Sequence, residues 1–266
     1  MAIYRINALQ WQHMEFVDTH CHIHEADYAL PEQEVRNLAD SAGVTRLICV
    51  GTDETTSAQA IAFAKGKDRV WASIGLHPHD AKLGNDSFAA LANLLPNSNV
   101  VAIGECGLDY FYNHSDKKDQ YAALEYQMHL AQNNDLPMIF HVRDAFDDFW
   151  PIFDNFSSLR GVVHSFTATT TELDQALARD LYIGLNGITT FTKNEKQLAA
   201  ARAVPLDRLL LETDAPFLTP KPLRGTINQP KNISIIADFL VSIRSESLPL
   251  LAAATTRNAR QLFGLK

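Results

Sequence analysis

The feature that most constrains this chain is an alternation of short apolar runs with longer helical patterns. The runs are not cleanly alternating between apolar and polar residues, which is typical of parallel strands buried on both faces. They lie at Phe16–Asp18, Arg46–Val50, Val70–Ile74, Val100–Gly104, Pro137–Phe140, Gly161–Val163, Tyr182–Leu185 and Leu209–Leu211.

A helical pattern fills the intervals between these runs. Residues 32–43 place Val35, Leu38, Ala39 and Ala42 on one face and end at Gly43. Similar patterns cover about 56–66, 87–95 (with Ser87 as its expected cap), 117–135, 145–155, 170–179 and 194–203, and two more follow the last strand, at about 232–245 and 248–263. Strands that alternate with helices over about 250 residues predict an α/β fold of the (β/α)8 TIM-barrel type. A doubly wound open sheet is the alternative, but residues 43–56, around the second predicted strand, lack the Gly-rich phosphate loop of that fold.

Length and composition fit one globular barrel domain. The chain has 266 residues, of which 46% are hydrophobic, and we expect a short extension at 1–13 followed by a single domain at 14–266. The N-terminus has no signal-peptide pattern, and no apolar run approaches the roughly 20 residues of a membrane helix. Three cysteines without paired spacing indicate a reducing compartment, so we expect a cytoplasmic protein without membrane contact.

The charge balance is acidic. There are 31 acidic against 23 basic residues, for a net charge of −8. This argues against a broad basic surface that would coat duplex nucleic acid, but it allows a local basic rim around a site.

Polar residues follow the predicted strands, at the barrel end where active sites form. Seven of the ten histidines lie within a few residues of a predicted strand end: His20, His22, His24, His77, His79, His141 and His164. Glu105 and Asp109 follow the fourth strand, and Glu212 and Asp214 follow the eighth. The remaining histidines, His13, His114 and His129, have no such context and are interpreted as ordinary surface or core residues.

The residue types in this set suit a divalent metal centre. His20 and His22 are two residues apart, so on a strand both imidazoles point the same way, whereas Cys21 points to the other face and packs. Carboxylates from Glu105 and Asp214 would add oxygen ligands, and a carboxylate between two clusters can bridge ions about 3.5–4 Å apart. Glu212 is not counted among the ligands; it is interpreted either as a partner of a ligand or as a buried polar group.

At these residues the sequence resembles the TatD family of metal-dependent deoxyribonucleases, within the amidohydrolase-like barrels. The motifs, which run nearly the whole chain from Phe16 to Gly264, are DTHCH, GLHPHD, AIGECGLDY, HVRDA, VVHSF, LLLETDAPFLTP, RGTINQP and TTRNARQLFG. Their conjunction in this order is highly specific, although H-x-H alone is weak. One departure is Gln229, where many members have Glu.

The resemblance implies two divalent ions. One would be held by His20, His22 and Asp214, the other by His141 and His164, with Glu105 bridging. Related amidohydrolases often bridge through a carboxylated lysine after the fourth strand, so Glu105 fits the nuclease branch. The imidazoles favour Zn²⁺ or Mn²⁺ by donor softness, while Mg²⁺ often serves phosphoryl chemistry because it is abundant.

Our leading hypothesis is phosphodiester hydrolysis on DNA, as a 3′–5′ exonuclease acting on single strands, with the 3′ polarity taken from the resemblance. Asp214 is the expected proton acceptor, Arg143 could bind a phosphate in a fork, and His77 could bond a phosphate or the leaving oxygen. We expect a monomer whose partner is single-stranded nucleic acid.

Two alternatives stay open at this point. The same barrel and metals support hydrolysis of an amide, a lactone or a small phosphoester, because fold does not fix substrate. A barrel that has lost catalysis and serves as a binding module is the other, and the intact ligand set argues against it.

Overall fold

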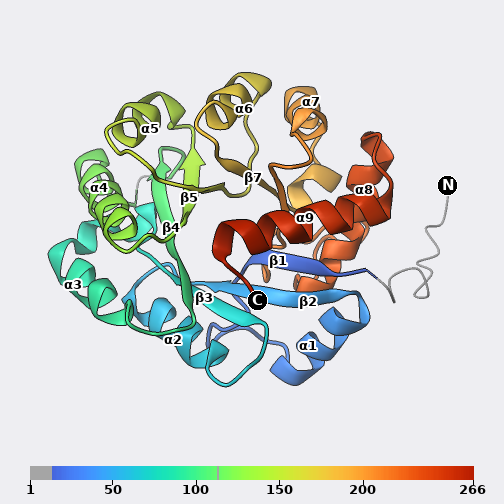
Figure 1. Ribbon diagram of the computed structural model, residues 1–266, viewed down its shortest axis with the longest axis horizontal. Helices are drawn as coiled ribbons and strands as arrows, with labels where there is room; N and C mark the ends of the chain where they lie inside the picture. Colours follow the sequence, from blue (N-terminus) through green and yellow to red (C-terminus); the bar gives the residue numbers. More distant parts are fainter. Residues whose placement is uncertain (1–13, 113) are drawn as a thin grey trace.

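Eight parallel strands form a ring in simple chain order, and the helices surround it (Figure 1). The computed structural model describes residues 14–112 and 114–266, so the extension expected at residues 1–13 lies outside the described residues. A parallel bridge between Cys21 and Ala215 joins the first strand to the segment after the last one. The predicted (β/α)8 barrel is therefore confirmed.

The strands supply the framework of the site. They are β1 Phe16–Cys21, β2 Val44–Val50, β3 Val70–Ile74, β4 Val100–Asp109, β5 Met138–Arg143, β6 Gly161–Val163, β7 Tyr182–Leu185 and β8 Leu209–Leu211. The α-helices are α1 Glu32–Ser41, α2 Glu54–Ala64, α3 Asn85–Leu94, α4 Lys117–Asn133, α5 Phe146–Phe153, α6 Thr170–Leu177, α7 Glu195–Ala203, α8 Ile233–Ile243 and α9 Leu248–Phe263. Short 3-10 helices are η2 Pro78–Leu83, η3 Gly187–Thr190 and η4 Pro230–Asn232.

The start of α3 differs from the prediction that Ser87 caps it. The helix begins at Asn85, and Ser87 lies inside its first turn, where its hydroxyl donates to Glu54 Oε2 at 2.7 Å. Gly84 and its polar neighbours Asn85 and Asp86 bring the chain into the helix earlier than the apolar pattern begins.

Helix α9 covers the end of the barrel opposite the metal ligands described below. Asn258 donates to the carbonyls of Leu206 and Leu209, both 2.9 Å away, and Thr256 donates to the carbonyl of Glu15. These carbonyls lie at the N-terminal ends of β8 and β1, and Figure 1 shows α9 crossing the ring. A second apolar cluster joins inward strand residues such as Ile48 to the end of α9.

Glycine allows β4 and β5 to approach closely beside the site. Gly107 has φ +154°, and a Cβ built there would lie 1.8 Å from the carbonyl oxygen of His141. Only a residue without a side chain fits, because any other would push β5 away.

Over residues 14–112 and 114–266, no helix combines the length and the apolar character that a membrane crossing requires.

Candidate metal centre

The barrel brings all six predicted ligands together at the C-terminal ends of the strands. His20 lies on β1 and His22 directly follows it, Glu105 lies on β4, and His141 lies on β5. His164 follows β6, and Asp214 lies three residues beyond β8. Although 194 residues separate His20 from Asp214, the Asp214 amide donates to the His20 carbonyl at 2.8 Å.

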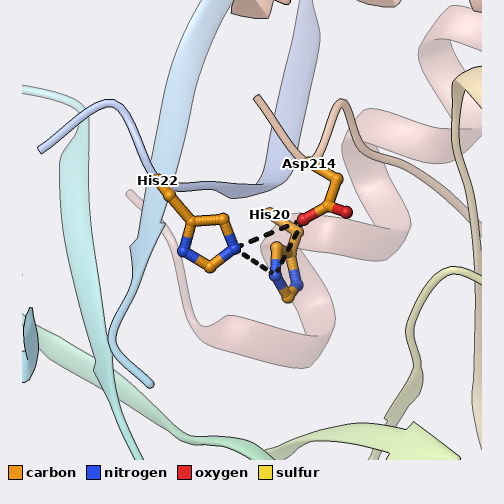
Figure 2. Close-up of side chains that lie close together, drawn as sticks. All are labelled: His20, His22 and Asp214. Carbon is orange, nitrogen blue, oxygen red and sulfur yellow. Dashed lines mark hydrogen bonds and ion pairs between the residues drawn. The ribbon is translucent and has the colours of Figure 1, made fainter. Parts of the chain in front are cut away.

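One group of ligand atoms consists of His20, His22 and Asp214 (Figure 2). The two Nε2 atoms of the histidines are 3.1 Å apart. Asp214 Oδ1 lies 3.3 Å from Nε2 of His22 and 3.6 Å from Nε2 of His20. Three potential ligand atoms thus point at one spot.

The second group surrounds Glu105. Its Oε1 atom lies 2.9 Å from Nδ1 of His141 and 2.8 Å from Nε2 of His164. Its Oε2 atom lies 3.2 Å from Nε2 of His20, which belongs to the first group. Glu105 is therefore the carboxylate between the two groups.

Hydrogen bonds fix which nitrogen of two histidines faces the centre. His22 Nδ1 is 2.8 Å from the carbonyl oxygen of Val50, so Nδ1 carries a proton and Nε2 is the nitrogen that faces the centre. His141 Nε2 is 2.9 Å from Asp109 Oδ2, which leaves Nδ1 as the lone-pair atom toward Glu105. Carbonyls and carboxylates behind metal-binding histidines act in this way.

His77 has the opposite arrangement. Its Nδ1 accepts a hydrogen bond from the amide of His79 at 3.1 Å, so the proton lies on Nε2, 3.4 Å from Glu105 Oε1. Burial is the main cause that lowers the pKa of His77 to about 4, which keeps the ring neutral. His77 is thus arranged as a hydrogen-bond donor toward Glu105, and its ring also lies with Glu105 and His141 in a group that could hold a metal ion.

Charges in this centre are strongly coupled. Burial would raise the pKa of Glu105, but the charges of the surrounding histidines outweigh it and hold this pKa well below its usual range. Burial would lower the pKa of His22, yet the hydrogen bond and charge of Asp214 outweigh it and raise this pKa to about 9. The charges of the carboxylates and imidazoles therefore stabilise one another, because these buried groups have little contact with solvent.

The donor set fits divalent ions by an independent observation. Imidazole nitrogens face one another at 3.1 Å and 3.4 Å, an arrangement that hydrogen bonds alone do not satisfy well. The Nε2 atoms of His20 and His164 also face Glu105, at 3.2 Å and 2.8 Å. Glu212 Oε1, which accepts from the Ser165 amide, lies 3.5 Å from His164 Nδ1, as expected for a carboxylate that orients a ligand.

The other polar residues predicted for the site lie at its rim or away from it. Arg143 ends β5, and its guanidinium lies over the ring of Phe111 at 3.8 Å. The loop after β8 carries two further cations that are candidates for phosphate contact, Lys221 and Arg224, and the Arg224 guanidinium lies over the ring of Phe191 at 3.9 Å. His24 is buried, and burial lowers its pKa to about 3. His13 lies outside the described residues.

The sequence placed Asp109 and His79 near strand ends, but it assigned neither residue a role in the site. Asp109 Oδ2 contacts His141 and also His79 Nε2, at 3.1 Å. The signal that could have identified Asp109 was its spacing: it is four residues beyond Glu105 on one strand, so both side chains point to the same side.

Comparison with known proteins gives one consistent family. The model of the family described as TatD related DNase matches residues 17–264. A Cronobacter sakazakii protein named 3'-5' ssDNA/RNA exonuclease TatD is 40% identical over 233 residues, covering 85% of this chain and 89% of its own. A Bacillus subtilis protein named uncharacterized metal-dependent hydrolase YabD is 34% identical over 249 residues, covering 92% and 98%.

Solved structures agree with this. The crystal structure of YjjV, a TatD homologue from Escherichia coli K12, superposes with a TM-score of 0.89 at 30% identity and covers 94% of this chain and 98% of that one. Sequence and structure thus point to the same metal-dependent hydrolases.

Proposed function

This chain belongs to the family of TatD-related DNases, and from that premise we propose that it trims single-stranded DNA from the 3′ end. In this proposal His20, His22 and Asp214 would hold one divalent ion and His141 and His164 the other, with Glu105 shared between them. The ligand atoms of His20, His22 and Asp214 form one such group in the structure, while Glu105 lies in a group with His20 and His164 and in another with His77 and His141.

The observation that carries the proposal is the position of Glu105. Its two oxygens face different groups of imidazoles, at 2.8–2.9 Å on one side and 3.2 Å on the other. A carboxylate shared by two ligand groups is suited to hold two ions close together, as two-metal phosphodiester hydrolysis uses them.

The side chains around the ions have distinct tasks. The ions, when bound, supply Lewis-acid charge at the phosphate and lower the pKa of a water molecule. Asp214 would accept a proton from a water molecule, because histidine contacts outweigh burial and hold its pKa below the ordinary value, so it is ionised. The neutral His77 donates from Nε2 to a phosphate oxygen or to the leaving oxygen.

The preference for a single strand rests on charge and on the relatives. The net charge of −8 leaves few cations for long tracks of phosphate contacts. Arg143 lies two residues beyond His141 on β5, so its fork of donors points to the same side as the ligand. The name 3'-5' ssDNA/RNA exonuclease of the Cronobacter relative supports the polarity.

The test is digestion of end-labelled oligonucleotides with Mg²⁺, Mn²⁺ or Zn²⁺. A 3′-labelled single strand should release its label at once as a mononucleotide, whereas a 5′-labelled strand should give a descending ladder. Internal cuts, or faster digestion of blunt duplex, would refute this mode of action. Small esters, lactones and amides belong in the same panel. Turnover of these compounds without DNA cleavage would show that the site performs amidohydrolase-type chemistry instead.

A further inference from the structure

Exposed aromatic rings gather at the mouth of the barrel. Among the described residues, the largely exposed big hydrophobic side chains are Leu83, Phe111, Tyr112, Phe217, Ile227 and Leu250. The aromatic ones, Phe111, Tyr112 and Phe217, all lie in loops that follow β4 or β8. Rings that are 54%, 42% and 56% exposed contribute little to the core, so another reason for their positions is needed.

Phe217 stands beside the first ligand group. Its ring centre is 6.2 Å from that of His22, and its amide donates to the carbonyl of Asp214 at 2.7 Å. Asn228 donates to the carbonyl of Phe217 at 2.6 Å and so holds the loop. The backbone is fixed while the ring faces solvent.

Phe111 stands beside the second ligand group. Asp109 Oδ1 accepts from the amides of Phe111 and Tyr112 at 2.9 and 3.0 Å, while its other oxygen contacts the ligand His141. The Arg143 guanidinium lies 3.8 Å from the ring centre of Phe111 and 5.0 Å from that of Tyr112. Asp109 therefore contacts both the aromatic loop and the proposed ligand His141.

The two positions lie across the barrel from one another. In a ring of eight strands in chain order, β4 and β8 are opposite. A strand of nucleic acid that reaches from Phe111 to Phe217 must therefore pass over the metal ligands.

The groove beside Phe111 suits bases better than phosphates. It has a volume of about 730 Å³ and is lined by Arg143 and Lys117 but also by Asp144, Asp147, Asp148 and Glu172. Four carboxylates against two cations disfavour a long track of phosphates in this groove and leave Arg143 for a single phosphate contact, whereas base–aromatic stacking adds affinity for each base.

We propose that Phe111 and Phe217 are stacking platforms for two bases of the substrate, one on each side of the metal centre. The inference rests on the proposed function. It also supplies a reason for single-strand preference, because a base can stack on a protein ring only after it has left its own duplex stack.

The test combines substitutions in the enzyme with removal of bases from the substrate. Phe111→Ala and Phe217→Ala are assayed on a single-stranded oligonucleotide and on the same strand with abasic residues at its last two positions. We expect kcat/KM on normal DNA to fall about 5- to 150-fold for each substitution, mainly through KM, which is the range for one stacked base. On the abasic strand the same substitutions should change kcat/KM less than about twofold.

Two controls separate stacking from disturbance of the site. Phe111→Trp keeps a stacking face and should retain activity, and Leu250→Ala removes an exposed apolar side chain on α9, at the other end of the barrel, without effect. Metal content and unfolding temperature of every variant should equal those of the wild type. An equal loss on normal and abasic strands, or none on normal DNA, overturns the stacking roles while the nuclease function stands. A wild type that cleaves no oligonucleotide removes both.

Discussion

His141 and Asp109 form a carboxylate–imidazole pair in which Nε2 donates to Oδ2 over 2.9 Å. The opposite nitrogen of the same ring faces Glu105 at 2.9 Å. Asp109 is buried, and its other oxygen is already occupied by two backbone amides. This carboxylate therefore determines the tautomer of a proposed ligand and anchors a rim loop.

Asp109→Asn should weaken metal binding. An amide has only one acceptor oxygen, so it must point its NH2 group either at His141 or at the two backbone donors. We expect metal affinity to fall about 10- to 100-fold, as for other partners of metal-bound histidines. Calorimetric titration of the metal measures this, with Asp148→Asn, a carboxylate on α5 at the rim, as the control. Unchanged affinity in Asp109→Asn would show that His141 needs no such partner.

His77→Ala should separate catalysis from metal binding. The proton on Nε2 makes His77 a donor, so its loss should lower kcat by about 100- to 1000-fold, as does the loss of one transition-state donor elsewhere. Metal stoichiometry should stay at the wild-type value, whereas His22→Ala should lose affinity at one site. A His77→Ala enzyme that lost an ion would make His77 a ligand.

Glu105→Ala should abolish turnover and weaken both sites together. The reason is that Glu105 oxygens contact His20 on one side and His141 and His164 on the other. Elemental analysis and titration after metal loading measure occupancy, with His22→Ala as the one-sided comparison. Two ions bound with near-wild-type activity in Glu105→Ala would contradict the bridging role.

Much of the fold was predictable because each strand is a local apolar run. The bounds of β3, β6, β7 and β8 match the predicted ones. By contrast, β4 and β5 continue past their apolar segments to Asp109 and Arg143, which pair in register. Polar residues there had been interpreted as loop. Their strand geometry depends on pairing between β4 and β5, which a local pattern does not contain.

The sequence predicted which polar residues gather at the site, but not their internal order. Positions near strand ends place the six proposed ligands at one end of the barrel, and the family resemblance selects them from the other polar residues there. Which nitrogen each histidine presents depends on distant partners, such as the carbonyl of Val50 for His22 and the amide of His79 for His77. The sequence offered His77 as a donor to a phosphate or to the leaving oxygen, but the hydrogen bond that directs its Nε2 toward the centre is not visible in a local pattern.

Metal affinity should rise with pH. In the metal-free protein the pKa of His22 is raised to about 9, because Asp214 outweighs the effect of burial, and that of His164 is raised by Glu105 in the same way. These rings hold protons at pH 7, and a metal ion must displace those protons in order to bind. Below the pKa of each histidine, one displaced proton therefore changes metal affinity by up to about tenfold per pH unit. Calorimetry in buffers of different ionisation enthalpy should detect proton release at pH 7. Metal binding at pH 7 without any proton release would contradict this pH dependence.

Charge reversal at Arg143 should affect nucleic-acid binding through salt-dependent phosphate contact. Each neutralised phosphate adds about 0.7 to the log–log slope of affinity against salt for single strands, and we expect two to four such contacts in all, shared with Lys221 and Arg224. Arg143→Glu should therefore reduce the slope by about 0.7 and raise KM, whereas a residue that only packs on Phe111 would leave the slope unchanged. Arg160→Glu is the matched control, because Arg160 directly precedes β6 at the opposite end of the barrel and pairs with Asp135. If both reversals shift the slope equally, the contribution of Arg143 is that of overall charge, and the phosphate contact must be assigned to another cation of the mouth.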